Sequence, residues 1–165
     1  MIVVIFGVSA AGKTTIGQLL ARELGWEFYE ADDFHSADNI KKMKRGVPLT
    51  DEDRRPWLGR LRELIEHSLA AGENAVLACS ALKKAYRDRL RVSEEVKFVF
   101  LRGDRARICK QLRQRRGHFM NPALLESQFQ DLEEPRSSEQ VLTVDLGGNP
   151  RDLVQLIKKK LRFRK

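Results

Sequence analysis

The chain has 165 residues, of which 42% are hydrophobic and 33% are charged, and its formal net charge is +8. This length and apolar content predict one domain with one core, and no apolar run is long enough to cross a membrane. The sequence also lacks the pattern of a signal peptide, and Cys79 and Cys109 lie outside any C-x-x-C pattern, so we expect a cytoplasmic protein with reduced thiols.

Apolar runs of strand length alternate with segments of helical periodicity along the chain. In chain order we predict strand 2–6, helix 14–24, strand 26–30, helix 53–71, strand 74–79, strand 96–101, helix 105–115, helix 121–132, strand 140–145 and helix 151–161. The first run is continuous and rich in β-branched residues, which is typical of a buried parallel strand. This alternation predicts a single α/β domain over residues 1–165, with a five-stranded parallel sheet and helices on both faces.

The residues after the first predicted strand match the P-loop pattern G-x-x-x-x-G-K-[ST] at every fixed position. They are Gly7, Val8, Ser9, Ala10, Ala11, Gly12, Lys13 and Thr14. The glycines let backbone N–H groups turn toward phosphate oxygens, and the N-terminus of the next helix adds positive potential. We expect Lys13 to contact the β- and γ-phosphates as a catalytic group and Thr14 to ligate Mg²⁺. The pattern therefore predicts ATP and Mg²⁺ as ligands, with Thr15 also at the nucleotide.

Two acidic residues, Glu30 and Asp32, lie at the end of the second predicted strand. They matter because the third strand ends at Cys79 and Ser80 without a carboxylate for the metal. Alternation along a strand would place Glu30 and Asp32 on the same side. We expect Asp32 to face the acceptor hydroxyl and to accept its proton, and Glu30 to contact Mg²⁺ through water. The alternative is an acidic loop that caps the following helix.

Beyond these motifs, the sequence resembles the gluconokinases, within the broader group that includes shikimate and adenylate kinases. The resemblance runs nearly end to end and rests on the P-loop and on residues 32–35, 39–43, 46–58, 79–88, 117–120, 127–129 and 132–135. It implies a three-layer P-loop kinase fold, similar to nucleoside monophosphate kinases, with a substrate-binding segment at about 32–72 and a lid at about 113–126. It further implies ATP-dependent phosphorylation of D-gluconate to 6-phospho-D-gluconate, and a homodimer.

The resemblance also suggests which residues bind the sugar acid. Arg54 is the first candidate for the carboxylate, because a guanidinium can donate two parallel hydrogen bonds to it. The other candidates lie after the second and third strands or in the lid: Asp32, His35, Lys83, Arg87 and His118. The alternative for each is a surface charge or a histidine of the core.

The lid and the adenine site complete the set of candidates. By resemblance, Arg115 is the catalytic lid arginine on the transferring phosphate, with Arg116 next, although this chain has Gln111 where relatives often have another arginine. Arg107 and the turn at 147–150 are candidates for the adenine site.

Two other functions stay open on the sequence. One is a kinase of the same fold with a shikimate-like or nucleotide acceptor. The other is a nucleic-acid-binding P-loop protein that uses the basic lid and the basic tail at 158–165, although no basic surface interleaved with aromatic residues is visible.

Overall fold

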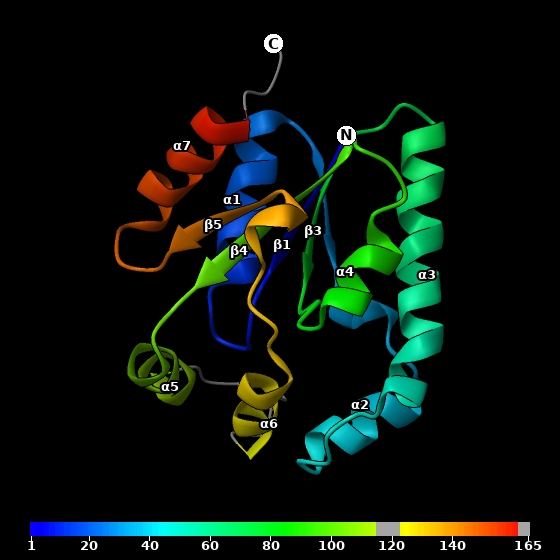
Figure 1. Cartoon of the computed structure of the whole chain (residues 1–165), viewed down its shortest axis with the longest axis vertical. Coiled ribbons are helices and arrows are strands. Elements are labelled where there is room, and N and C mark those ends of the chain that lie inside the picture. The colour runs from blue at the N-terminus through cyan, green and yellow to red at the C-terminus, as the bar shows by residue number, and fades with distance from the viewer. Residues whose placement is uncertain (115–122, 162–165) are drawn as a thin grey trace.

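The computed structural model describes residues 1–114 and 123–161. Five parallel strands form one sheet in the order β2-β3-β1-β4-β5 (Figure 1). The strands are β1 (Ile2–Phe6), β2 (Glu27–Glu30), β3 (Ala75–Cys79), β4 (Val96–Arg102) and β5 (Val141–Asp145). This confirms the predicted α/β fold with a five-stranded parallel sheet.

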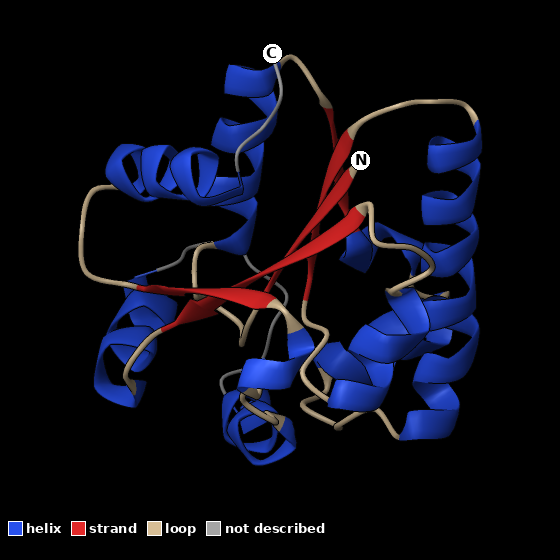
Figure 2. Cartoon of the chain, turned by 45° about the horizontal axis from the view of Figure 1, so that its top comes forward, coloured by secondary structure: helices blue, strands red, loops and turns tan. Residues whose placement is uncertain are grey.

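Helices cover both faces of the sheet, and Figure 2 shows the strands running between them. The α-helices are α1 (Lys13–Leu24), α2 (Ala37–Lys44), α3 (Asp51–Ala70), α4 (Lys84–Leu90), α5 (Arg105–Gln114), α6 (Ala123–Asp131) and α7 (Pro150–Leu161), with short 3₁₀ helices η1 (Ala31–Phe34) and η2 (Ser137–Glu139). No helix within 1–114 or 123–161 is long and apolar enough to cross a membrane.

The central strand β1 divides the core into two clusters because its side chains alternate between the faces. Val3 and Ile5 pack in the cluster formed with α1, α5, α6 and α7. Ile2, Val4 and Phe6 pack in the cluster formed with α3 and α4. All five of these residues are buried, so β1 is fixed from both sides, and the loop that follows it starts from a rigid base.

Helices α2 and α4 were not predicted, because each is short and mostly charged, so too few apolar residues recur to show helical periodicity. Helix α3 begins two residues before the predicted start. The cause is a capping box: the N–H of Asp53 donates to the Thr50 hydroxyl (3.2 Å), and the N–H of Thr50 donates to the Asp53 carboxylate (3.0 Å). This cap fixes the first turn of α3, which carries Arg54.

Candidate active site

The P-loop connects β1 to α1 at the carboxyl end of the sheet. Gly7 has φ of +149°, and a Cβ there would lie 2.9 Å from the carbonyl oxygen of Leu101, so only glycine fits. Gly12 is the N-cap of α1 and offers no side chain to the first N–H groups of the helix, which leaves them available for phosphate. Nζ of Lys13 donates to the carbonyl of Val8 at 2.9 Å and so lies over the loop. Thr15 is exposed on the next position of α1.

Glu30 lies directly against the P-loop helix. The Thr14 hydroxyl donates to Glu30 Oε2 at 2.6 Å. Burial raises the pKa of the Glu30 carboxyl, and the hydrogen bond from Thr14 opposes this rise. A hydroxyl and a carboxylate are oxygen ligands of the kind that Mg²⁺ prefers, so this pair fits the metal of a nucleotide site. Among the described residues no group of three or more His, Cys, Asp or Glu is placed to hold a metal ion.

Asp32 is placed by a different element from the one that the sequence predicts. Strand β2 ends at Glu30, and Asp32 lies in η1, so strand alternation does not determine its direction. The indole N–H of Trp57 donates to the carbonyl of Ala31 at 2.7 Å and anchors this turn to α3. Asp32 nevertheless lines the same pocket as Lys13.

One pocket joins the P-loop to α3. It encloses about 580 Å³ of space that includes its open mouth, which suits a small substrate beside a terminal phosphate. Polar and apolar side chains both line it; the lining residues are Ser9, Lys13, Asp32, His35, Met43, Pro48, Leu49, Arg54, Trp57, Ser80, Leu82, Leu124, Ser127 and Gln128.

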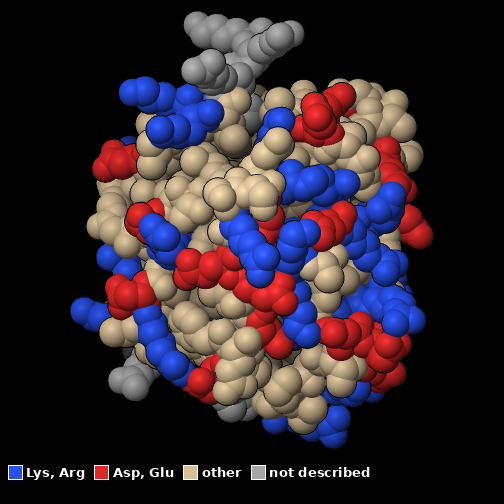
Figure 3. All heavy atoms as spheres, viewed as in Figure 1, with Lys and Arg blue, Asp and Glu red and all other residues tan. Residues whose placement is uncertain are grey.

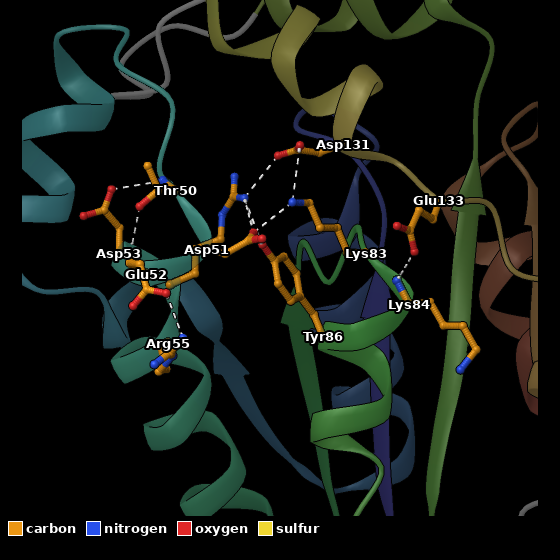
Figure 4. A network of polar contacts seen from close by, with 11 residues as sticks. Thr50, Asp51, Glu52, Asp53, Arg55, Lys83, Lys84, Tyr86, Asp131 and Glu133 are labelled. Atoms are coloured by element: carbon orange, nitrogen blue, oxygen red, sulfur yellow. Dashed lines mark hydrogen bonds and ion pairs between the residues drawn. The ribbon is translucent and has the colours of Figure 1, made fainter.

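Arg54 lies at the α3 end of this pocket, with a side chain that is 13% exposed. Its Nη1 donates to Tyr86 Oη and to Asp131 Oδ2, each at 3.1 Å. Lys83 Nζ lies 2.8 Å from Asp51 Oδ1 and 3.9 Å from Asp131 Oδ1, and the Tyr86 hydroxyl donates to Asp51. We call these five residues the Arg54 network; Figure 4 shows Asp51, Lys83, Tyr86 and Asp131 converging from α3, α4 and α6.

His35 lies flat against Trp57, with ring centroids 4.5 Å apart and planes within 11°. Its Nε2 is 4.0 Å from Asp32 Oδ1, and its Nδ1 is buried with no hydrogen-bond partner among the residues described. Burial lowers the pKa of His35 to about 4, against the opposing pull of Asp32. At neutral pH the pocket therefore contains a neutral imidazole, which can both donate and accept a hydrogen bond. Trp57 is buried, and it also forms part of the pocket wall.

Arg87 does not fit the role of a sugar-acid ligand that the sequence suggested. Its side chain is fully buried, and its three nitrogens donate to Glu139 and to the carbonyls of Ala81 and Leu82. The guanidinium also stacks 5.1 Å above the ring of Phe6. With every nitrogen satisfied by protein oxygens, Arg87 has no contact to offer a ligand.

The other predicted residues fall into three groups. Lys83 caps α4 and binds Asp51 rather than lining the pocket. Arg107 lies half-buried on α5 away from the pocket lining, with its Nε buried and without a hydrogen-bond partner in the described part of the chain. Arg115 and His118, with most of the predicted lid, lie outside the described residues.

Three residues of the pocket region were missed by the sequence analysis. Gln128 on α6 accepts a hydrogen bond from the N–H of Ser9 at 2.6 Å, and so links α6 to the P-loop. Residues 127–129 belong to the stretches that carry the family resemblance, but the sequence analysis gave Gln128 no role. Asp131 and Tyr86 contact Arg54 from distant parts of the chain, and no local pattern identifies such partners.

Comparison with known proteins agrees with this geometry. The shikimate kinase family model matches residues 9–150. The thermosensitive gluconokinase of Escherichia coli (strain K12) is 46% identical over 145 residues, which cover 87% of this chain and 78% of that protein. A solved sugar kinase from Janibacter sp. HTCC2649 superposes with a TM-score of 0.92 at 44% identity, covering 98% of this chain and 94% of its own. A solved gluconokinase from Sinorhizobium meliloti 1021 gives a TM-score of 0.83 at 37% identity, covering 98% and 95%.

Proposed function

The chain belongs to the gluconokinase family and carries a shikimate kinase-family domain, and from this premise we propose that its pocket binds D-gluconate for phosphorylation by ATP. The enzyme is a kinase that transfers phosphate to an alcohol group, with 6-phospho-D-gluconate as the product. The observation that carries the proposal is that Lys13 of the P-loop and Arg54 of α3 line one and the same pocket.

The two ends of the pocket suit the two ends of a sugar acid. At the α3 end, Arg54 receives the carboxylate, because a guanidinium and a carboxylate form paired charge-assisted hydrogen bonds. At the P-loop end, the acceptor hydroxyl approaches Asp32 and the γ-phosphate beside Lys13. The neutral imidazole of His35 lies between them and can exchange hydrogen bonds with a sugar hydroxyl. The presence of these groups in one pocket supports a polyhydroxy acid as the acceptor.

The chemistry asked of the protein is mainly positioning and charge neutralisation. Lys13 neutralises charge on the transferring phosphoryl group, and Asp32 orients the acceptor hydroxyl and accepts its proton late in transfer. Mg²⁺, with Thr14 as a ligand and Glu30 reached through water, would neutralise charge on the phosphate oxygens when bound. We retain Arg115 as the lid cation on the phosphate and His118 as a sugar contact, and we retain Thr15 and Arg107 as nucleotide contacts.

Further properties are proposed on weaker grounds. The family resemblance suggests a homodimer, which light scattering would test, and the two free cysteines suit the reducing cytoplasm.

The nucleic-acid alternative is disfavoured by the distribution of charge on one face of the molecule. On the face shown in Figure 3, Lys and Arg side chains alternate with Asp and Glu rather than forming one basic band.

The test is ADP release measured with Mg-ATP and D-gluconate, beside a panel of shikimate, other sugar acids and nucleoside monophosphates. We expect turnover on gluconate at about 1–100 s⁻¹. We also expect loss of turnover when Mg²⁺ is chelated or when Lys13 is replaced in Lys13→Ala. Turnover on another acceptor with none on gluconate would contradict the assignment of substrate while leaving the kinase activity intact.

A further inference from the structure

Of the Arg54 network, only Arg54 itself lines the pocket. Asp131 and Tyr86 both contact one atom of Arg54, Nη1, and neither of them is among the residues that line the pocket. No hydrogen bond between described residues uses Nε or Nη2 of Arg54. The protein therefore fixes one corner of the guanidinium and leaves the Nε–Nη2 edge without a hydrogen-bond partner among the described residues. This edge is one of the two that can bind a carboxylate with two parallel hydrogen bonds.

Arg87 shows what a complete set of partners looks like in the same molecule. Its Nη1 donates to two carbonyl oxygens, while Nε and Nη2 donate side by side to the two oxygens of Glu139 at 2.8 and 3.1 Å. Arg54 has the first half of this arrangement, with two oxygens on Nη1. The second half corresponds to a carboxylate on the Nε–Nη2 edge.

We propose that Asp131 is a positioning residue for the acceptor: with Tyr86 it anchors Nη1 of Arg54, so that the Nε–Nη2 edge is oriented for the carboxylate of the sugar acid. This inference rests on the proposed function and adds a residue to it. Asp131 acts through Arg54 and does not itself contact the substrate.

The position of Asp131 supports this role. It is the last residue of α6, where a carboxylate meets the negative end of the helix dipole, and no basic residue of the last turn offsets it. The compensation comes from Arg54 at 3.1 Å and Lys83 at 3.9 Å, both on other elements. Among the described residues, the ion pairs of Asp131 with Arg54 and Lys83 offset this local cost.

Helix α6 also connects the two halves of the active site. Gln128, three residues before Asp131, accepts the N–H of Ser9 in the P-loop, and Ser127 and Gln128 line the pocket. The same helix therefore contacts the nucleotide cradle and, through Asp131, the arginine of the acceptor site. Asp131 therefore fixes the position of Arg54 relative to the phosphate that the acceptor hydroxyl must reach.

A competing role for Asp131 would be that of an internal substitute that occupies Arg54 until the substrate displaces it. That role predicts a carboxylate on the pocket-facing edge, with two parallel hydrogen bonds, whereas Asp131 makes one hydrogen bond to Nη1. The charges of the network also balance without the substrate, with Arg54 and Lys83 against Asp51 and Asp131. The two roles predict opposite changes in the KM for gluconate.

The experiment measures kcat and KM for gluconate and for ATP in Asp131→Asn, which keeps the size of the side chain and an acceptor oxygen. Loss of the charge-assisted bond should raise the KM for gluconate roughly tenfold, with kcat and the KM for ATP near wild type. Tyr86→Phe removes the other partner of Nη1 and should raise the same KM by a smaller factor. The matched control is Glu52→Gln, which weakens the ion pair between Glu52 and Arg55 in the first turn of α3 and should leave kcat and both KM values unchanged.

A double-mutant cycle with Arg54→Lys separates positioning from a general structural role. If Asp131 acts through Arg54, Asp131→Asn should have little further effect on the KM for gluconate in the Arg54→Lys background. A full, additive effect in that background, an unchanged KM in Asp131→Asn alone, or a lowered KM would each overturn the inference. Absence of wild-type turnover on gluconate would instead overturn the proposed function, and this inference with it.

Discussion

Arg54 and Arg87 differ in how much of their hydrogen-bonding capacity the protein uses. Both were predicted from the sequence as ligands of the sugar acid. Arg87 is fully buried, and a carboxylate and two carbonyls satisfy all its nitrogens. Arg54 is 13% exposed, borders the pocket and has protein partners, among the described residues, on Nη1 alone. The first is built into the fold, and the second keeps donors for a ligand.

The difference teaches that the partner of an arginine, rather than its local sequence, decides its role. Glu139 reaches Arg87 from 52 residues away, and Asp131 reaches Arg54 from 77 residues away. Burial alone raises the pKa of Glu139, but the hydrogen bonds from Arg87 and from the Arg136 N–H bring it below its usual value. The buried pair is therefore ionised, and it joins α4 to η2 on the side of the sheet where α3 and α4 pack.

The largest expected effect comes from breaking the buried pair. Arg87→Met leaves the carboxylate of Glu139 buried without its partner, and we expect the free energy of unfolding to fall by about 3–5 kcal/mol. Denaturant unfolding followed by circular dichroism measures this loss. The KM for gluconate, measured on the folded fraction, should stay near wild type because Arg87 does not contact the pocket.

A second variant controls this result. Adding Glu139→Gln to Arg87→Met removes the uncompensated charge while keeping an acceptor for the N–H of Arg136, and it should recover part of the lost stability. If Arg87→Met raised the KM for gluconate and left stability unchanged, Arg87 would belong with Arg54, and the comparison would fail.

The next effect is the reverse of the first, because activity should fall while stability changes little. Arg54→Ala removes the carboxylate ligand of the pocket, and we expect kcat/KM for gluconate to fall about a hundredfold. The free energy of unfolding should change by about 1 kcal/mol or less, because Asp131 stays partly exposed and keeps Lys83 nearby. Steady-state kinetics and denaturant unfolding on the same preparation measure both. A loss of stability as large as that of Arg87→Met would show that Arg54 is also mainly structural.

The sequence predicts the fold and the nucleotide cradle well because both depend on local signals. The continuous apolar run of 2–6 predicts β1, and the spacing of Gly7, Gly12 and Lys13 predicts a loop between strand and helix, where the structure has it. Its limits appear where few apolar residues mark an element. The short, charged helices α2 and α4 have too few apolar residues to show periodicity, and the N-cap of α4, Lys83, makes no side-chain capping hydrogen bond that would mark its start.

The acceptor site is less predictable because its geometry is tertiary. The sequence places Asp32 by strand alternation, whereas the chain leaves β2 at Glu30 and turns through η1, fixed by the indole of Trp57. Likewise, nothing near Arg87 in the sequence signals that Glu139 will neutralise it. Both outcomes depend on contacts between segments that only the folded sheet brings together.

The smallest expected effect tests how burial changes the protonation of His35, whose carboxylate partner lies farther from it than Glu139 lies from Arg87. His35 is 5% exposed and lies 4.0 Å from Asp32, and burial lowers its pKa from 6.5 to about 4. As the pH falls below 6.5, the unfolded chain therefore binds a proton that the folded chain refuses, so the free energy of unfolding falls between pH 6.5 and 4. His35→Phe keeps a ring on Trp57 without this titration. The stability of wild type relative to His35→Phe should fall by about 1 kcal/mol between pH 7.5 and 5.5.

Glu30, whose pKa burial raises, is present in both proteins, so its opposite contribution largely cancels in the difference. Denaturant unfolding at the two pH values measures the change, and His67→Gln, which removes an exposed imidazole from α3, should not reproduce it. A difference that stays constant between the two pH values would show that His35 keeps its proton in the pocket, as Arg54 and Arg87 keep their charge.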